Sequence, residues 1–236
     1  MKTTIIPLSN LAISFIPVLF VLGVFIKWEL NWKSFSYACL RMISQLLIVG
    51  YFLSHIFKQN SFAQTMAIVL FMLIVSGWIS LYSIKNLRTK FLKYAFIALF
   101  CGSLPVLMLV TMLVIPTEPW YQPAFLIPLA GMVFSSSMNT IGLASERFEK
   151  EKLSFSAEEA KKNAFKAALI PLINTFFAVG LVSLPGMMTG QILSGVSPLL
   201  AVRYQIVVMT MVMGAGGISA AIFLYFRTKY EGFGEE

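Results

Sequence analysis

Seven apolar windows, each long enough to cross a lipid bilayer, follow one another along this 236-residue chain. A transmembrane helix needs about 20 consecutive, mostly apolar residues. Charged residues make up only 12% of the chain and fall mainly between the windows, whereas a soluble domain carries roughly 25%. The sequence therefore predicts an all-α, polytopic membrane helix bundle of about seven transmembrane helices, forming one transmembrane domain over residues 1–236. The windows are Leu8–Ile26, Phe35–Phe57, Phe62–Ile84, Tyr94–Ile115, Pro123–Ala144, Ala167–Met187 and Leu199–Phe226.

The basic residues between the windows are strongly biased toward one side of the membrane. The chain has 18 Lys and Arg residues, yet only Lys2 and Lys58 fall in the connections of one of the two sides. Because Lys and Arg accumulate in cytoplasmic loops, we expect the N-terminus outside, the C-terminus inside and the long connection 145–166 in the cytoplasm. Membrane orientation thus accounts for the net charge of +8, and nucleic acid is not expected as a partner.

The connection 145–166 is the longest polar stretch of the chain, and its pattern predicts helix. Ser154 or Ser156 is suited to cap a helix that begins near Ala157 with two Glu residues in its first turn. Two pairs of opposite charge stand four residues apart, as in a helix. They are Glu146–Lys150 and Glu158–Lys162.

A polar helical segment that joins two membrane spans is well suited to contact a soluble protein. We expect exposed apolar side chains in this connection, which favours a docking surface; the alternative is a solvated, charge-laced hairpin without a partner. The residues expected to make the contact are Phe148, Leu153, Phe155, Glu158 and Glu159.

Polar residues inside the windows indicate a candidate pathway across the membrane. In the second window an Arg and a Gln lie four apart on one helical face; the alternative is an Arg that extends to the interface beside a Gln bonded to a neighbouring helix. A buried Asn needs several hydrogen-bond partners, and a Pro frees a backbone carbonyl. For the small polar residues of the fifth window, close helix packing is the alternative. The candidate pathway residues are Arg41, Gln45, Asn139, Pro171 and Asn174.

Several kinds of chemistry have no sequence signal. The chain contains no Asp, and its Glu residues lie in loops, tails or interfaces, whereas ion-coupled transporters place ionisable groups inside the bilayer. No nucleotide-binding Gly-rich loop, metal-ligand spacing or nucleophile motif is present. We therefore expect neither an enzyme nor a metal site nor a bound cofactor. Any uphill transport would draw its energy from another chain.

The run Gly180-Leu-Val-Ser-Leu-Pro-Gly-Met-Met-Thr-Gly-Gln191 resembles a known family. With Ala167-Ala-Leu-Ile-Pro171 and Ile127-Pro-Leu-Ala-Gly-Met132, it is similar to the FetB iron-export ABC permeases, whose relatives include plant aluminium-tolerance permeases. The chain departs from that pattern at Asn174-Thr175, where the family tends to have Asp-Ser, and in a shorter 145–166 connection. The motif residues are Leu184, Pro185, Gly186, Met187, Met188, Gly190 and Gln191.

The resemblance implies a function that composition does not. It implies an inner-membrane (plasma membrane) permease, surrounded by lipid, that exports a metal such as iron as a homodimer. A separate ABC ATPase subunit would bind the ATP and dock on the cytoplasmic connection 145–166. Two alternatives stay open: a channel or facilitator that needs no ATP, and a membrane scaffold that transports nothing.

Overall fold

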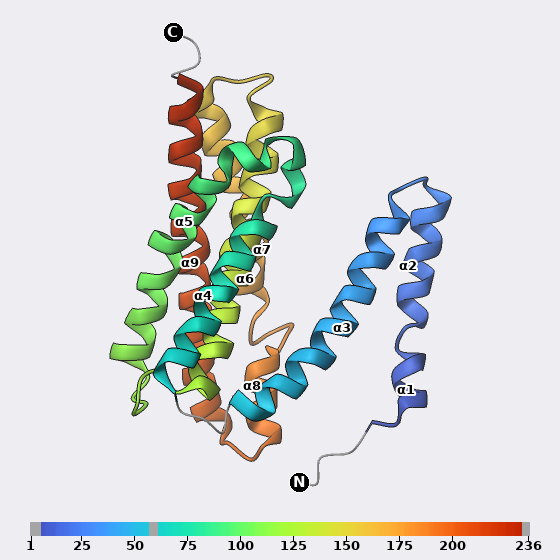
Figure 1. Ribbon diagram of the computed structural model, residues 1–236, viewed down its shortest axis with the longest axis vertical. Coiled ribbons are helices and arrows are strands. Elements are labelled where there is room, and N and C mark those ends of the chain that lie inside the picture. Colours follow the sequence, from blue (N-terminus) through green and yellow to red (C-terminus); the bar gives the residue numbers. More distant parts are fainter. Residues whose placement is uncertain (1–5, 57–60, 233–236) are drawn as a thin grey trace. The chain divides into compact units, whose positions relative to one another are not determined.

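The computed structural model describes residues 6–56 and 61–232, and in these ranges the chain is helical without any strand (Figure 1). The predicted all-α class is therefore confirmed. The helical elements are α1 (Leu8–Ile13), α2 (Ile16–Lys27), α3 (Trp32–Ile56), α4 (Phe62–Ser80), η1 (Tyr82–Leu87), α5 (Arg88–Leu109), η2 (Val110–Val114), α6 (Pro123–Glu151), α7 (Ala157–Ala178), α8 (Gly186–Leu193) and α9 (Pro198–Gly232).

The described helices form two compact units, one within Met1–Gln59 and the other within Asn60–Glu236. In the N-terminal unit a turn after α2 folds α3 back along α2, and Glu29 adopts a φ of 55° in that turn. The rings of Phe25 and Phe35 stack with centres 4.8 Å apart and tie the two helices together. The assignment of residues 1–236 to a single domain stays a prediction.

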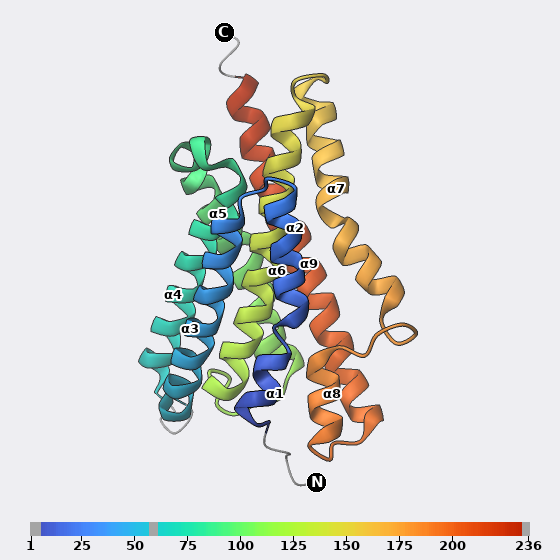
Figure 2. The same ribbon diagram turned by 90° about the vertical axis from the view of Figure 1, so that its right-hand side faces the viewer.

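In the second unit, α6 and α9 run side by side, and α4, α5 and α7 pack around them (Figures 1 and 2). Small side chains bring these helices close together, since a Cβ on Gly102 of α5 would lie 2.4 Å from Ser219 Oγ of α9. The buried hydroxyl of Ser103 donates to Ser137 Oγ at 2.8 Å and lies 3.2 Å from Ser219 Oγ. In this part of the fifth window, close packing is therefore the correct interpretation.

Six helices in the described ranges are long and apolar enough, by length and composition, to cross a membrane. The sixth window, Ala167–Met187, is not among them. Its helix α7 begins earlier, ends at Ala178 and is followed by a non-helical segment, Val179–Pro185, which we call the break. Gly180 has a φ of +84° there. Glycine adopts a positive φ without steric cost, so the helix can end at this point. Hydropathy alone cannot show this interruption.

Candidate functional site

The α6–α7 hairpin, residues 145–166, is helical almost throughout. Helix α6 continues to Glu151, and α7 starts at Ala157 as predicted. Ser156 is the N-cap of α7, because its Oγ accepts a hydrogen bond from the backbone N–H of Glu159 at 3.3 Å. The expected pair Glu146–Lys150 forms at 2.8 Å.

One predicted ion pair differs. Glu158 pairs with Lys161 at 2.6 Å, three residues away, and not with Lys162. Both spacings place the two side chains on neighbouring positions of one helical face, so the helix prediction is unaffected by the change of partner.

A partly buried ion-pair cluster joins the hairpin to the last turns of α9. Arg227 donates through Nε to Glu149 Oε1 at 3.0 Å and also pairs with Glu231 at 2.5 Å. Lys152 Nζ lies 2.7 Å from Glu149 Oε2 and 3.0 Å from Glu231 Oε1. The guanidinium of Arg227 also stands 4.2 Å from the ring centre of Phe91 on α5. The hairpin is therefore in direct contact with α9, and Arg227 continues that contact to α5.

Phe148 does not belong to the exposed surface of the hairpin. It is fully buried in a cluster with Ala160 and Ala164 of α7 and Leu224 of α9. The expectation of an exposed Phe148 was wrong because α7 folds back along α6 and covers this face, and its small Ala residues allow the close approach. The side chain of Phe148 holds the hairpin together.

The other predicted contact residues are exposed. Leu153 is 82% exposed and Phe155 49% exposed in the turn between the helices, and Glu158 and Glu159 are exposed at the start of α7. Two large apolar side chains in a turn that also carries charges make a surface suited to a protein partner. Their role in contacting an ATPase stays a prediction.

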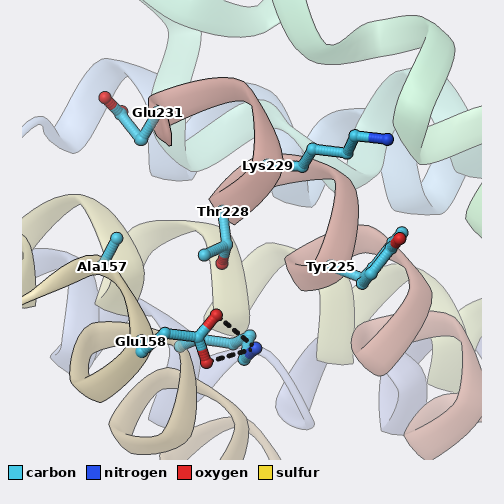
Figure 3. A pocket seen from close by; sticks show the side chains of 7 residues that line it. Ala157, Glu158, Tyr225, Thr228, Lys229 and Glu231 are labelled. Carbon is cyan, nitrogen blue, oxygen red and sulfur yellow. Dashed lines mark hydrogen bonds and ion pairs between the residues drawn. The ribbon is translucent and has the colours of Figure 1, made fainter. Parts of the chain in front are cut away.

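Beside this surface lies a pocket of about 370 Å³ between the first turn of α7 and the end of α9 (Figure 3). Glu158 and Lys161 line it from α7, and Tyr225, Thr228 and Glu231 line it from α9. The pocket adjoins the ion-pair cluster, since Glu231 belongs to both. The hairpin and the C-terminal end of α9 therefore line this pocket together.

The basic connections of the second unit share one end of the bundle. Lys90, at the start of α5, has its Nζ 4.5 Å from the ring centre of Tyr230 near the end of α9. Ser83 in the turn before α5 donates to the carbonyl of Gly142 on α6 at 3.3 Å. The turn between α4 and α5 therefore lies at the same end as the hairpin and the end of α9. The positive-inside prediction requires these basic connections to lie at the same end of the bundle.

The predicted pathway residues are only partly brought together. Asn139 of α6 and Pro171 of α7 line one open groove of about 340 Å³, together with Ser135 and Leu143. Asn174 is exposed further along α7 and does not line that groove. Arg41 and Gln45 lie one turn apart on α3, in the N-terminal unit. The described residues contain no group of three or more His, Cys, Asp or Glu side chains placed so that they could hold a metal ion.

The motif run surrounds the break and the short helix α8. Leu184 and Pro185 end the break, and Gly186 begins α8. An apolar pocket of about 360 Å³ lies here, lined by Leu184, Pro185 and Met188 on one side and by residues of α9 on the other. Among the α9 residues is Gln205, which is 7% exposed and whose Oε1 has no hydrogen-bond partner.

A family model described as "Uncharacterised protein family (UPF0014)" matches residues 8–230, nearly the whole chain. The chain belongs to the UPF0014 family. It is 35% identical to a UPF0014 membrane protein of Synechocystis, with 73% of each chain covered. It is 33% identical to the probable iron export permease protein FetB of Escherichia coli, over 80% of this chain and 78% of FetB. It is 29% identical to the Arabidopsis thaliana protein ALUMINUM SENSITIVE 3, over 88% of this chain and 82% of that protein. No solved structure matches.

UPF0014 membership confirms the resemblance to FetB and to its plant relatives. The six apolar helices and the membrane relatives together make this UPF0014 chain a multi-pass membrane protein. FetB, one of these relatives, is named as a probable iron export permease.

Two polar residues of this UPF0014 chain were missed as site residues. Arg227 lies near the end of the chain and its partner Glu149 is 78 positions away, so no local pattern connects them. Gln205 is a polar residue within an apolar window, the same signal that singled out Gln45 in the second window. That signal was sufficient to mark Gln205 as a candidate.

Proposed function

We propose that this chain is the membrane-spanning permease subunit of an ABC transporter that exports a metal cation, iron by analogy with the FetB relative. A separate ATPase subunit binds ATP and docks on the α6–α7 hairpin, so the permease itself binds no cofactor. The functional unit is a homodimer in the inner (plasma) membrane, with the N-terminus outside and the hairpin in the cytoplasm.

The observation that carries this proposal is the construction of the hairpin. It presents Leu153 and Phe155 at its turn, and the buried pair of Glu149 with Arg227 fixes its base to α9. A solvated hairpin without a partner needs neither exposed large apolar side chains nor a rigid connection to the bundle. A lever that transmits the movement of a docked subunit needs both.

The lack of an energy source within this chain supports a second subunit. The apolar windows contain no acidic residue at their centres, and the chain has no nucleotide-binding loop. Proton or ion coupling within the bilayer relies on such ionisable groups. ATP hydrolysis on a docked subunit supplies the driving force that this chain lacks.

The groove that this proposal assigns to the metal is lined by neutral side chains. Asn139 beside Pro171 offers amide and backbone oxygens in an open groove, and oxygen atoms of this kind suit a partly hydrated cation. Two copies of the chain enclose the path between them. Arg41, Gln45 and Asn174 complete the set of candidate pathway residues.

Reconstitution tests the proposal. The purified chain is placed in liposomes loaded with Fe²⁺ or Mn²⁺, together with an ABC ATPase subunit from the same organism, and metal movement is followed with and without ATP. Metal movement that requires both proteins and ATP supports the proposal. Movement by the chain alone, down the gradient and without ATP, identifies a facilitator and contradicts it. Absence of both transport and ATPase stimulation points to a scaffold and also contradicts it.

A further inference from the structure

The connection between α4 and α5 carries positive charge that no acidic residue balances. Residues 61–117 contain no Asp or Glu, and no cation of this connection forms an ion pair with a carboxylate of the described residues. In the hairpin, at the same end of the bundle (Figure 1), cations such as Lys150 and Lys152 do pair with Glu. The unbalanced cations are Lys85, Arg88, Lys90 and Lys93.

Two of these cations, Lys90 and Lys93, lie one turn apart at the start of α5, and both are exposed. Nζ of Lys90 is 4.5 Å from the ring centre of Tyr230 on α9, and Nζ of Lys93 is 4.8 Å from the ring centre of Tyr94. An ammonium group that lies over a ring keeps its charge, and its N–H groups that point away from the ring can donate to an anion. Arg88 instead donates to a backbone carbonyl of α4, so it adds positive charge beside the two lysines.

Further along α5, the face that carries Lys93 becomes apolar. Ile97 and Phe100 follow Lys93 at helical spacings of four and three, and both side chains are exposed. A Lys side chain at the start of a helix extends toward the helix N-terminus and away from the hydrocarbon core. The face therefore presents cations at the boundary with water and apolar side chains within the bilayer. A soluble anion can use only the first part of this surface, whereas a phospholipid can use both.

We propose that the start of α5 binds an anionic phospholipid, with its phosphate at Lys90 and Lys93 and its acyl chains along Ile97 and Phe100. Ammonium groups donate charge-assisted hydrogen bonds to phosphate oxygens, and clusters of basic residues beside a transmembrane helix are typical of anionic-lipid binding. Phosphatidylcholine has the same phosphate but also a cation of its own, so the unbalanced positive charge exerts no net attraction on it. This inference requires only that the chain lies in a membrane, and it does not depend on the proposed transport function.

Native mass spectrometry of the full chain in detergent micelles tests the proposal. The probe is dioleoyl phosphatidylglycerol, and dioleoyl phosphatidylcholine is expected to bind about tenfold more weakly or worse. Lys90→Gln combined with Lys93→Gln is expected to lower the affinity for phosphatidylglycerol about 25-fold, or roughly fivefold for each cation. Lys90→Arg combined with Lys93→Arg keeps both charges and is expected to bind normally.

The matched control removes the same charge from the same end of the bundle. Arg147→Gln combined with Lys150→Gln takes away two cations of the hairpin, each of which is already paired with a Glu. The affinity for phosphatidylglycerol is expected to stay unchanged in this variant. Equal weakening in the control and in the Lys90 and Lys93 variant would show a general effect of net charge and would overturn the proposal.

A single substitution keeps the test decisive if the double variant inserts poorly into the membrane. Lys93→Gln leaves the other cations of the connection to orient the chain and is expected to weaken binding about fivefold. Glycerol phosphate, which has no acyl chains, is expected not to compete, and this arm distinguishes a lipid from a soluble phosphate. The proposal is overturned if the two lipids bind equally, if glycerol phosphate displaces phosphatidylglycerol, or if the Gln variants keep full affinity for the lipid. Full lipid affinity with weakened binding of an ATPase subunit would identify a protein contact instead.

Discussion

Glu149 of α6 and Arg227 of α9 form a hydrogen-bonded ion pair across 78 positions of sequence, with Nε and Oε1 3.0 Å apart and the side chain of Arg227 only 3% exposed. Removal of Arg227 leaves Lys152 as the remaining partner of Glu149 and Glu231, whereas an exposed pair contributes little. The hairpin is therefore attached to α9 by an interaction that depends on both residues.

Substitution of Arg227 tests this attachment. Arg227→Met is expected to lower the stability of the detergent-solubilised protein by about 2 kcal/mol, because Glu149 loses its charge-assisted hydrogen bonds with Arg227 and keeps only the pair with Lys152, and thermal unfolding measures the loss. Glu146→Gln is the control: it breaks the exposed pair with Lys150 and is expected to change stability by less than about 0.5 kcal/mol. Equal effects of the two substitutions would show that the cluster does not anchor the hairpin.

The N-cap of α7 gives a second test of the hairpin. Ser156→Ala removes the acceptor for the Glu159 N–H and is expected to cost about 1 kcal/mol. Ser154→Ala, two residues earlier in the same turn, removes no cap and is expected to be neutral. Hydrogen exchange of the first turn of α7 reports the difference. Similar exchange in both variants would mean that the cap does not fix the start of the helix.

The close approach of α5 and α9 predicts a strong effect at one glycine. Gly102→Ala places a Cβ 2.4 Å from Ser219 Oγ and 2.7 Å from its backbone nitrogen, so the two helices must separate at a cost of roughly 1–3 kcal/mol. Gly214→Ala, with no atom within 4 Å of the added Cβ, is expected to be neutral or slightly stabilising. Thermal unfolding of the two variants compares them, and a neutral Gly102→Ala would refute the tight contact.

The predicted orientation is testable with single cysteines on a background that lacks Cys39 and Cys101. A membrane-impermeant maleimide is expected to modify Glu118→Cys in intact cells, because this connection faces outward. It is expected to modify Ser154→Cys in the hairpin only after the membrane is permeabilised. The reverse pattern would place the hairpin outside and remove the proposed docking surface from the cytoplasm.

Local signals predicted the parts of the hairpin that local chemistry determines. The start of α7 at Ala157 and its cap Ser156 follow from residues within one turn, and the Glu146–Lys150 pair from the helical repeat. The apolar windows likewise located the long helices, since the bilayer requires a minimum apolar length.

The errors have a common cause in tertiary contacts. Phe148 was taken as exposed because nothing near it in the sequence shows that Ala160 and Ala164 cover it. The sixth window was taken as one helix because hydropathy does not respond to the positive φ of Gly180. Long-range pairing, as between Glu149 and Arg227, has no trace in the local pattern.

The most direct test of the account measures the affinity of the ABC ATPase subunit for this chain in lipid nanodiscs. Phe155→Asp places a charge in the apolar part of the contact, and charge reversal at Glu158 and Glu159 inverts the charge of its polar part. Both changes are expected to weaken binding at least tenfold and to abolish stimulation of ATP hydrolysis. Phe155→Leu is expected to bind normally. If the charged variants bind with unchanged affinity, the hairpin is not where the ATPase docks.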